Sequence, residues 1–169
     1  MSPNNKDLEA FITDLKEPEE YPGFLLWQAS NLWYRNMKNT LKYFGTTFTQ
    51  FTILTSLIYL SKNNESINQK QIALHAKIDI MMTSDVLKTL ERKKLVVRYP
   101  NPKDRRHNLL KITQKGARLL MKIFAHVDQT DIKFFKTLGN DVSLFTAGLE
   151  KLIQANYDNI YKVSSRFNS

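Results

Sequence analysis

Cysteine is missing from the 169-residue sequence, and this absence removes several kinds of chemistry at once. Disulfide bonds, thiolate zinc sites and thiol-based redox sensing are all excluded. The histidines, His75, His107 and His126, lack the close spacing of metal ligands. We therefore expect neither a metal site nor a cofactor.

Long apolar runs and the signatures of common enzymes are also missing. No segment approaches the roughly 20 apolar residues that a membrane-spanning helix needs. The sequence contains no Gly-x-Ser-x-Gly, no His-Glu-x-x-His and no glycine-rich phosphate loop. The start of the chain is acidic, unlike a secretory signal. We expect a cytoplasmic protein that has no enzymatic activity and no contact with a membrane.

Glycine and proline are scarce, with five of each, so no low-complexity linker is evident and we expect one compact unit. Positive charge, by contrast, is abundant. The formal net charge is +9, although residues 1–22 carry six acidic side chains against two lysines, so the rest of the chain is more basic still. A strongly basic body favours a polyanionic partner, because binding releases the counterions condensed on phosphates.

Helical periodicity dominates the first half of the body. Apolar residues recur at helical spacing and predict a long amphipathic helix over about 24–43. A glycine then interrupts the pattern, and either Thr47 or Thr49 can cap a following helix. Asn68 is a plausible N-cap for a shorter helix, and a further helix follows residues 77–79. Two short helices joined by a tight turn are the helix-turn-helix pattern.

After the second short helix the spacing becomes strand-like. Apolar residues at 95–97 and 109–112 flank a polar, turn-rich segment at 101–107. This arrangement predicts a β-hairpin with a basic tip. We expect four apolar side chains to hold the hairpin in place: Leu90, Leu95, Val97 and Ile112.

Helical periodicity returns from 113 to 139, and Asp141 can cap a last helix. Helices of this length outside a small binding domain need a second surface to cover their apolar faces. Another copy of the chain is the economical supplier, since two-fold pairing is the commonest oligomeric arrangement. We therefore expect a homodimer.

The residues around the hairpin form a specific pattern. The run Leu-Glu-x-x-Gly-Leu-Val-x-Arg, a turn with Asp-x-Arg, and a final Leu-Thr-x-x-Gly are matched by Leu90, Glu91, Leu95, Val96, Arg98, Asp104, Arg106, Ile112, Thr113 and Gly116. In these residues the chain resembles the MarR family of bacterial transcriptional regulators, over about residues 23–155. Lys94 replaces the usual glycine, so the recognition helix is expected to end differently.

The resemblance implies a mainly α-helical fold with a small β-hairpin wing, that is, a winged helix-turn-helix with a helical dimerisation region. The expected parts are a polar acidic extension (1–22), an N-terminal dimerisation helix (23–46), a DNA-binding lobe (47–113), C-terminal dimerisation helices (114–160) and a tail (161–169). Within the lobe, the recognition helix should cover about 80–93 and the wing about 95–113.

The expected partner is double-stranded DNA, contacted by the start of the first short helix, the recognition helix and the wing. The residues expected to make these contacts are Asn68, Gln69, Lys70, Met81, Met82, Ser84, Asp85, Lys88, Arg98, Lys103, Asp104, Arg105 and Arg106. By the resemblance, Arg106 enters the minor groove and Asp104 orients the wing. An arginine at the end of a stiff ribbon suits a narrow, electronegative minor groove.

Several of these assignments have a simple structural alternative. Asn68 and its neighbours can serve only to cap a helix. Met81 and Met82 can meet thymine methyl groups or equally fill gaps in the core. Asp85 can accept a hydrogen bond from cytosine but would repel phosphate, so its role is the least secure.

Aromatic residues are dense around the junction of the first two long helices. They are most simply core residues, with a weaker interpretation as a pocket for a small aromatic or amphipathic ligand: Trp27, Trp33, Tyr34, Tyr43 and Phe48. The function that emerges is a DNA-binding regulator, acting as a repressor on a pseudo-palindromic operator and released by a ligand. The alternative is a winged helix that binds RNA or protein.

Overall fold

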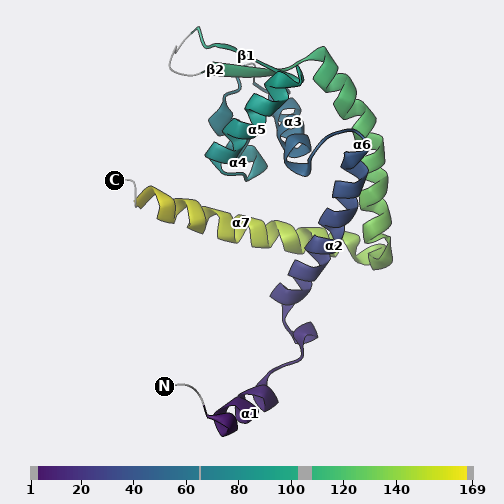
Figure 1. Ribbon diagram of the computed structural model, residues 1–169, viewed down its shortest axis with the longest axis vertical. Coiled ribbons are helices and arrows are strands. Elements are labelled where there is room, and N and C mark those ends of the chain that lie inside the picture. The colour runs from purple at the N-terminus through teal and green to yellow at the C-terminus, as the bar shows by residue number, and fades with distance from the viewer. Residues whose placement is uncertain (1–3, 65, 103–107, 167–169) are drawn as a thin grey trace. The chain divides into compact units, whose positions relative to one another are not determined.

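A computed structural model describes residues 4–64, 66–102 and 108–166, and it describes the side chains only as far as residue 156, leaving out that of Asn5. The chain divides into two compact units, residues 1–127 and 128–169, where the sequence suggested a single one. The fold is mainly helical with one β-hairpin, which confirms the expected fold class (Figure 1).

The acidic extension forms two helical elements. Helix α1 (Asn5–Asp14) starts with a capping box, in which the Asn4 side chain accepts from the Asp7 N–H and the Asp7 carboxylate accepts from the Asn4 N–H. The 3₁₀ helix η1 (Pro18–Glu20) follows. On α1, Leu8, Phe11 and Ile12 are exposed, so the extension is amphipathic rather than only polar.

Two longer helices come next. Helix α2 (Pro22–Lys42) lies where the sequence predicted a helix over about 24–43. The turn that closes this helix contains Gly45, whose φ of +59° is the left-handed conformation that glycine adopts easily. Helix α3 (Phe48–Ser61) is capped by the Thr47 hydroxyl, which accepts from the Gln50 N–H.

The helix-turn-helix consists of α4 (Gln69–Ala76) and α5 (Ile80–Arg92). Strands β1 (Val96–Pro100) and β2 (Asn108–Ile112) follow and pair antiparallel, with Val96 opposite Ile112 and Pro100 opposite Asn108. An additional bridge joins Asn68 to Leu109, so the hairpin is anchored to the start of α4.

The core of this lobe gathers apolar side chains from α3, α4, α5, the hairpin and α6 (Gln114–Phe135). Its fully buried members include Ile53, Leu54, Ile72, Leu87 and Leu90. A second cluster joins Met37 and Leu41 of α2 to Ile123 and Val127 of α6.

One core prediction is wrong. Val97 is 47% exposed, whereas its neighbour Val96 is only 3% exposed. Side chains alternate between the two faces of a strand, and the strand begins at Val96, so Val96 faces the core and Val97 faces outward. Leu95 is buried as part of the turn that ends α5, so the strand alternation starts one residue later.

The second unit is a helical hairpin. The last turns of α6 lead into the 3₁₀ helix η2 (Lys136–Asp141) and then α7 (Val142–Arg166). Gly139, with φ of +53°, makes the bend. Phe135 lies close to both Phe134 and Phe145, with ring centroids 5.0 and 5.7 Å away.

Candidate nucleic-acid interface

Helix α5 has a buried side and an outward side. Thr83, Leu87 and Leu90 are fully buried. On the outward side Met81 is 71% exposed and Met82 54% exposed, and Asp85 and Lys88 are also exposed, while Ser84 is half-buried. The recognition-helix residues singled out from the sequence therefore lie together on the side of α5 that faces away from the core.

The first turn of α5 is fixed by Asp79. Its carboxylate accepts hydrogen bonds from the N–H groups of Met81 (2.8 Å) and Met82 (3.1 Å). The Gln69 side chain donates to the Ile80 carbonyl at 3.2 Å, which links the starts of the two helices. The orientation of α5 relative to α4 is thus set by polar contacts as well as by the core.

Asp85 is neutralised within its own helix. Its carboxylate lies 2.9 Å from the Lys88 ammonium, and both side chains are mostly exposed. An acid on a helix expected to face DNA would repel phosphates, but this partner offsets its charge. The same pairing occupies Lys88, which is therefore not an isolated cation.

At the start of α4, Asn68 forms a capping box with Gln71. The Asn68 side chain accepts from the Gln71 N–H at 3.0 Å, and the Gln71 side chain accepts from the Asn68 N–H at 2.8 Å. The Gln69 side chain is already bonded to the Ile80 carbonyl. The next residue, Lys70, has an exposed cationic side chain. Capping accounts for Asn68, and Lys70 is the residue suited to a phosphate.

Arg98 on β1 faces Glu91 on α5, with Nε 3.3 Å from the carboxylate. The Arg98 Nε and Nη2 atoms are buried, and neither has a hydrogen-bond acceptor among the described residues. The ion pair therefore ties the hairpin to α5 without satisfying the guanidinium. The rest of the predicted wing contacts, Lys103, Asp104, Arg105 and Arg106, lie outside the described residues together with His107.

The end of α5 is closed by a Schellman motif centred on Lys94. The Lys94 N–H donates to the Glu91 carbonyl (2.8 Å), and the Leu95 N–H donates to the Leu90 carbonyl (2.9 Å). Lys94 has a φ of +59°, so the lysine adopts the left-handed conformation that the usual glycine would adopt. The expectation of a different helix end is therefore wrong, because Lys94 forms the same left-handed turn that a glycine would form.

Sequence reasoning missed a set of long-range bonds around Lys93. Its ammonium donates to the Gly45 carbonyl (2.8 Å) and to the Gln50 side chain (2.9 Å), which joins the end of α5 to the corner between α2 and α3. The Lys115 ammonium donates to the Lys93 carbonyl at 2.9 Å. No local pattern could reveal bonds between residues more than 40 positions apart.

The aromatic residues predicted to line a pocket do not gather around one cavity. Trp33 and Tyr34 each meet Phe48 edge-on, with centroids 5.4 Å apart, whereas Tyr43 is 90% exposed. Trp27 and Tyr34 also line a groove of about 620 Å³ along α2, together with the cations Arg35 and Lys38.

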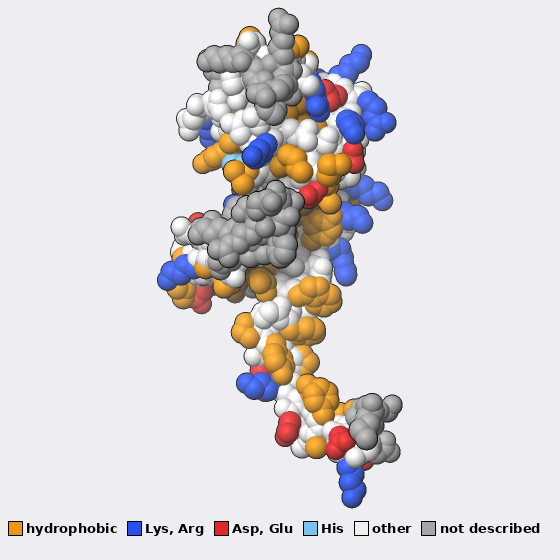
Figure 2. Space-filling view, turned by 90° about the vertical axis from the view of Figure 1, so that its left-hand side faces the viewer, with side chains coloured by type: hydrophobic (Ala, Val, Ile, Leu, Met, Phe, Trp, Pro, Cys, Tyr) orange, Lys and Arg blue, Asp and Glu red, His pale blue; other side chains and the backbone are white. Residues whose placement is uncertain are grey.

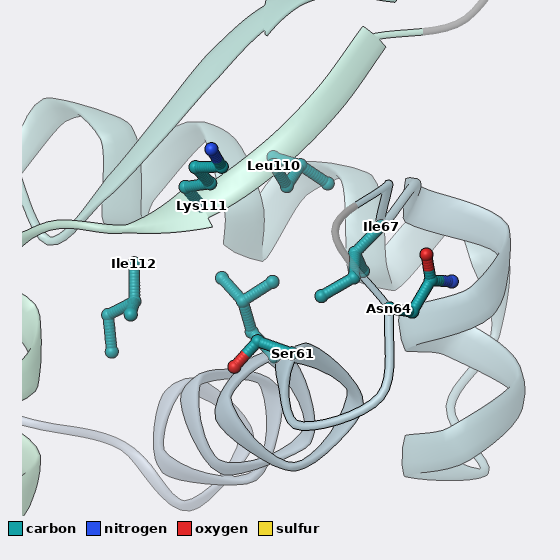
Figure 3. A pocket seen from close by; sticks show the side chains of 7 residues that line it. Ser61, Asn64, Ile67, Leu110, Lys111 and Ile112 are labelled. Carbon is teal, nitrogen blue, oxygen red and sulfur yellow. The ribbon is translucent and has the colours of Figure 1, made fainter.

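A second hollow lies between the end of α3, the segment before α4 and β2. It measures about 380 Å³, and Figure 3 shows Ser61, Ile67 and Leu110 around it. The Lys111 ammonium lies over the Tyr99 ring, 5.3 Å from its centroid. None of the aromatic residues proposed from the sequence lines this hollow.

The sequence and the fold both resemble those of known proteins. The sequence profile of the MarR family matches residues 46–107. The helix-turn-helix transcriptional regulator YdcH of Bacillus subtilis is 36% identical over 137 residues, which is 81% of this chain and 92% of YdcH. The chain belongs to the MarR family.

Solved structures agree with this membership. A mutant MarR from Escherichia coli complexed with operator DNA superposes with a TM-score of 0.71 at 25% identity, covering 78% of this chain and 92% of that one. The repressor CouR bound to a 23-mer DNA duplex gives 0.72 at 26% identity, covering 83% and 99%. CouR from Rhodococcus jostii bound to p-coumaroyl-CoA gives 0.71 at 23% identity, covering 83% and 95%.

The chain is thus a MarR-family helix-turn-helix transcriptional regulator and not an enzyme. In the regulator, the family's Thr-x-x-Gly pair has a structural role. The Thr113 hydroxyl donates to the Lys94 carbonyl (2.8 Å) and accepts from the Gly116 N–H (3.0 Å). A Cβ on Gly116 would overlap the Leu95 carbonyl oxygen, so only glycine lets α6 approach the hairpin this closely.

Within residues 4–64, 66–102 and 108–166, no three His, Asp or Glu side chains are grouped so that they could hold a metal ion. Of the helices that the structure describes, none has both the length and the apolar content needed to cross a membrane.

Proposed function

We propose that this regulator binds double-stranded DNA as a homodimer and represses transcription from a pseudo-palindromic operator. The observation that carries the proposal is the outward side of α5, which holds Met81, Met82, Asp85 and Lys88 away from the core. Helix α5 enters the major groove, and Arg106 on the wing enters the adjacent minor groove. The DNA-bound structures of E. coli MarR and CouR support this arrangement.

Exposed apolar side chains support the dimer. On α2, Leu25 and Leu26 are exposed, and so are Leu144 and Leu152 on α7. Figure 2 shows hydrophobic side chains along the visible surface of the segment that contains the N-terminal half of α2. Large apolar side chains exposed in this way are typical of protein interfaces. We assign dimerisation to residues 23–46 and 114–160 and DNA binding to residues 47–113.

The dimer is tested by sedimentation at micromolar concentration, where one species of twice the chain mass is expected. The DNA interaction is tested by selecting bound sequences from random duplexes and then measuring affinity by gel shift at fixed salt. Two half-sites about one helical turn apart are expected, because a dimeric groove reader needs that spacing. A parallel selection from random RNA is the comparison: enrichment of RNA but not of duplex DNA would favour an RNA-binding winged helix, and no enrichment of either would favour a protein partner.

The wing is tested with Arg106→Ala. The variant should bind the selected duplex at least tenfold more weakly, because a minor-groove arginine is lost, and it should still sediment as a dimer. Arg35→Ala, which removes the same side chain from α2, is the matched control; because α2 is assigned to dimerisation, the control must first sediment as a dimer, and it should then bind DNA normally. Equal affinity of Arg106→Ala and the wild type would contradict the assignment.

We also propose that a small aromatic anion releases the regulator from DNA by binding the groove along α2. The groove offers Trp27 and Tyr34 as apolar walls and Arg35 and Lys38 as cations. The p-coumaroyl-CoA complex of CouR supports a ligand of this chemistry. Titration with benzoate, followed by quenching of Trp27 fluorescence in a Trp33→Phe background, tests the site. Quenching that persists unchanged in Arg35→Ala/Lys38→Ala would refute it.

As a regulator that must reach the chromosome, the protein is assigned to the bacterial cytoplasm. Repression is tested by placing the selected operator in front of a reporter gene. Higher reporter expression in cells that lack the regulator is the expected result, and lower expression would identify an activator.

A further inference from the structure

The start of α5 carries a small apolar surface that the fold does not use. Ile80, Met81 and Met82 are all exposed, although each is a large apolar side chain. The buried side of the same turn is already filled by Thr83, which is fully buried and donates to the Asp79 carbonyl at 2.8 Å. The two methionines therefore do not fill gaps in the core.

The same turn offers little to a phosphate group. The N–H groups of Met81 and Met82 both donate to the Asp79 carboxylate, so they are not available to an anion. That carboxylate is also negatively charged and repels phosphate. What the first turn of α5 presents outward is methionine side chains.

Only one group in the major groove of DNA matches such a surface. Each base pair displays hydrogen-bond donors and acceptors there, and thymine adds its 5-methyl group, which is apolar. Methionine is flexible and polarisable, so it adapts to a methyl group without needing an exact fit. The charged half of α5, with Asp85 and Lys88, begins one turn further along and offers no apolar surface to a methyl group.

We propose that Met81 and Met82 form a binding site for the 5-methyl groups of thymine, so that the regulator selects thymine at the base pairs beneath the start of α5. The inference rests on the proposed binding of duplex DNA and adds the base that this part of the helix reads. Covering one methyl group should change the affinity about fourfold.

The test uses deoxyuridine, which differs from thymine only by lacking the methyl group. Duplexes carrying the sequence selected by the wild-type protein are synthesised with each half-site thymine replaced in turn by deoxyuridine. The wild type should lose affinity about fourfold at each contacted position. Met81→Ala and Met82→Ala should each bind the thymine and deoxyuridine duplexes equally at the position that they contact.

Met121→Ala is the matched control, because Met121 is 67% exposed, between the values for Met81 and Met82, but lies on α6. It should retain the wild-type preference for thymine. The proposal is overturned if the wild type binds both duplexes equally, if the preference survives in both α5 variants, or if the selected half-sites contain no thymine. Failure to enrich any duplex would instead refute the proposed DNA binding, so the two failures are distinguishable.

Discussion

Replacing Lys94 by glycine should stabilise the protein. Lys94 holds a φ of +59°, which costs a residue with a Cβ about 1–2 kcal/mol relative to right-handed backbone. Glycine avoids this cost but loses about 0.5–1 kcal/mol more backbone entropy on folding. The Lys94 side chain is exposed, and the bonds of this turn use backbone atoms that glycine retains. We expect a net gain of about 0.5–1 kcal/mol.

The assay is thermal unfolding followed by circular dichroism, at one protein concentration because dissociation of the proposed dimer would make Tm concentration-dependent. A gain of this size should raise Tm by about 1–4 °C for a chain of this length. Lys94→Ala is the control, since it removes the same side chain but keeps the Cβ, and it should give no increase. An equal increase in both variants would refute the backbone argument, and so would no increase in Lys94→Gly.

The remaining predictions concern the hairpin contact, the charge of α5 and oxidation. Gly116→Ala should destabilise the protein by about 1–3 kcal/mol in the same assay, because its Cβ would overlap the Leu95 carbonyl oxygen. Asp85→Asn should tighten DNA binding at low salt and steepen its salt dependence, since it removes an acid and releases Lys88. Peroxide cannot act through thiols, so any effect of peroxide on DNA binding should disappear when all five methionines are replaced by leucine.

The helix-turn-helix and its caps could be predicted because their signals are local. Asn68 caps the helix that the sequence assigned to it, and of the two candidates for the preceding helix, Thr47 and Thr49, the cap is Thr47. The hairpin was also predicted, but the assignment of Val97 to the core failed by one residue. The alternation of a strand predicts which side chains are buried only if the first strand residue is known. Here the strand starts at Val96 because Leu95 belongs to the turn that ends α5.

The acidic extension carried a signal that was available but unused. Asn4 and Asp7 have the spacing of a capping box, and Leu8, Phe11, Ile12 and Leu15 recur at helical spacing. Net charge obscured this pattern, because six acids made the segment look merely polar. By contrast, the bonds from Lys93 to Gly45 and Gln50 join distant residues, so local spacing could not have predicted them.

The ends of α2, α4 and α5 show why the glycine rule for helix ends is only a preference. All three close with the same pair of backbone bonds and a left-handed residue, yet this residue is Gly45 in the first and a lysine, Lys77 or Lys94, in the others. At Lys94 the left-handed conformation is stabilised by contacts with the rest of the lobe. Leu95 is buried in the core, and the Thr113 hydroxyl donates to the Lys94 carbonyl. Burying Leu95 contributes about 1.5–3 kcal/mol, which offsets the cost of about 1–2 kcal/mol for the positive φ, so the turn forms without a glycine.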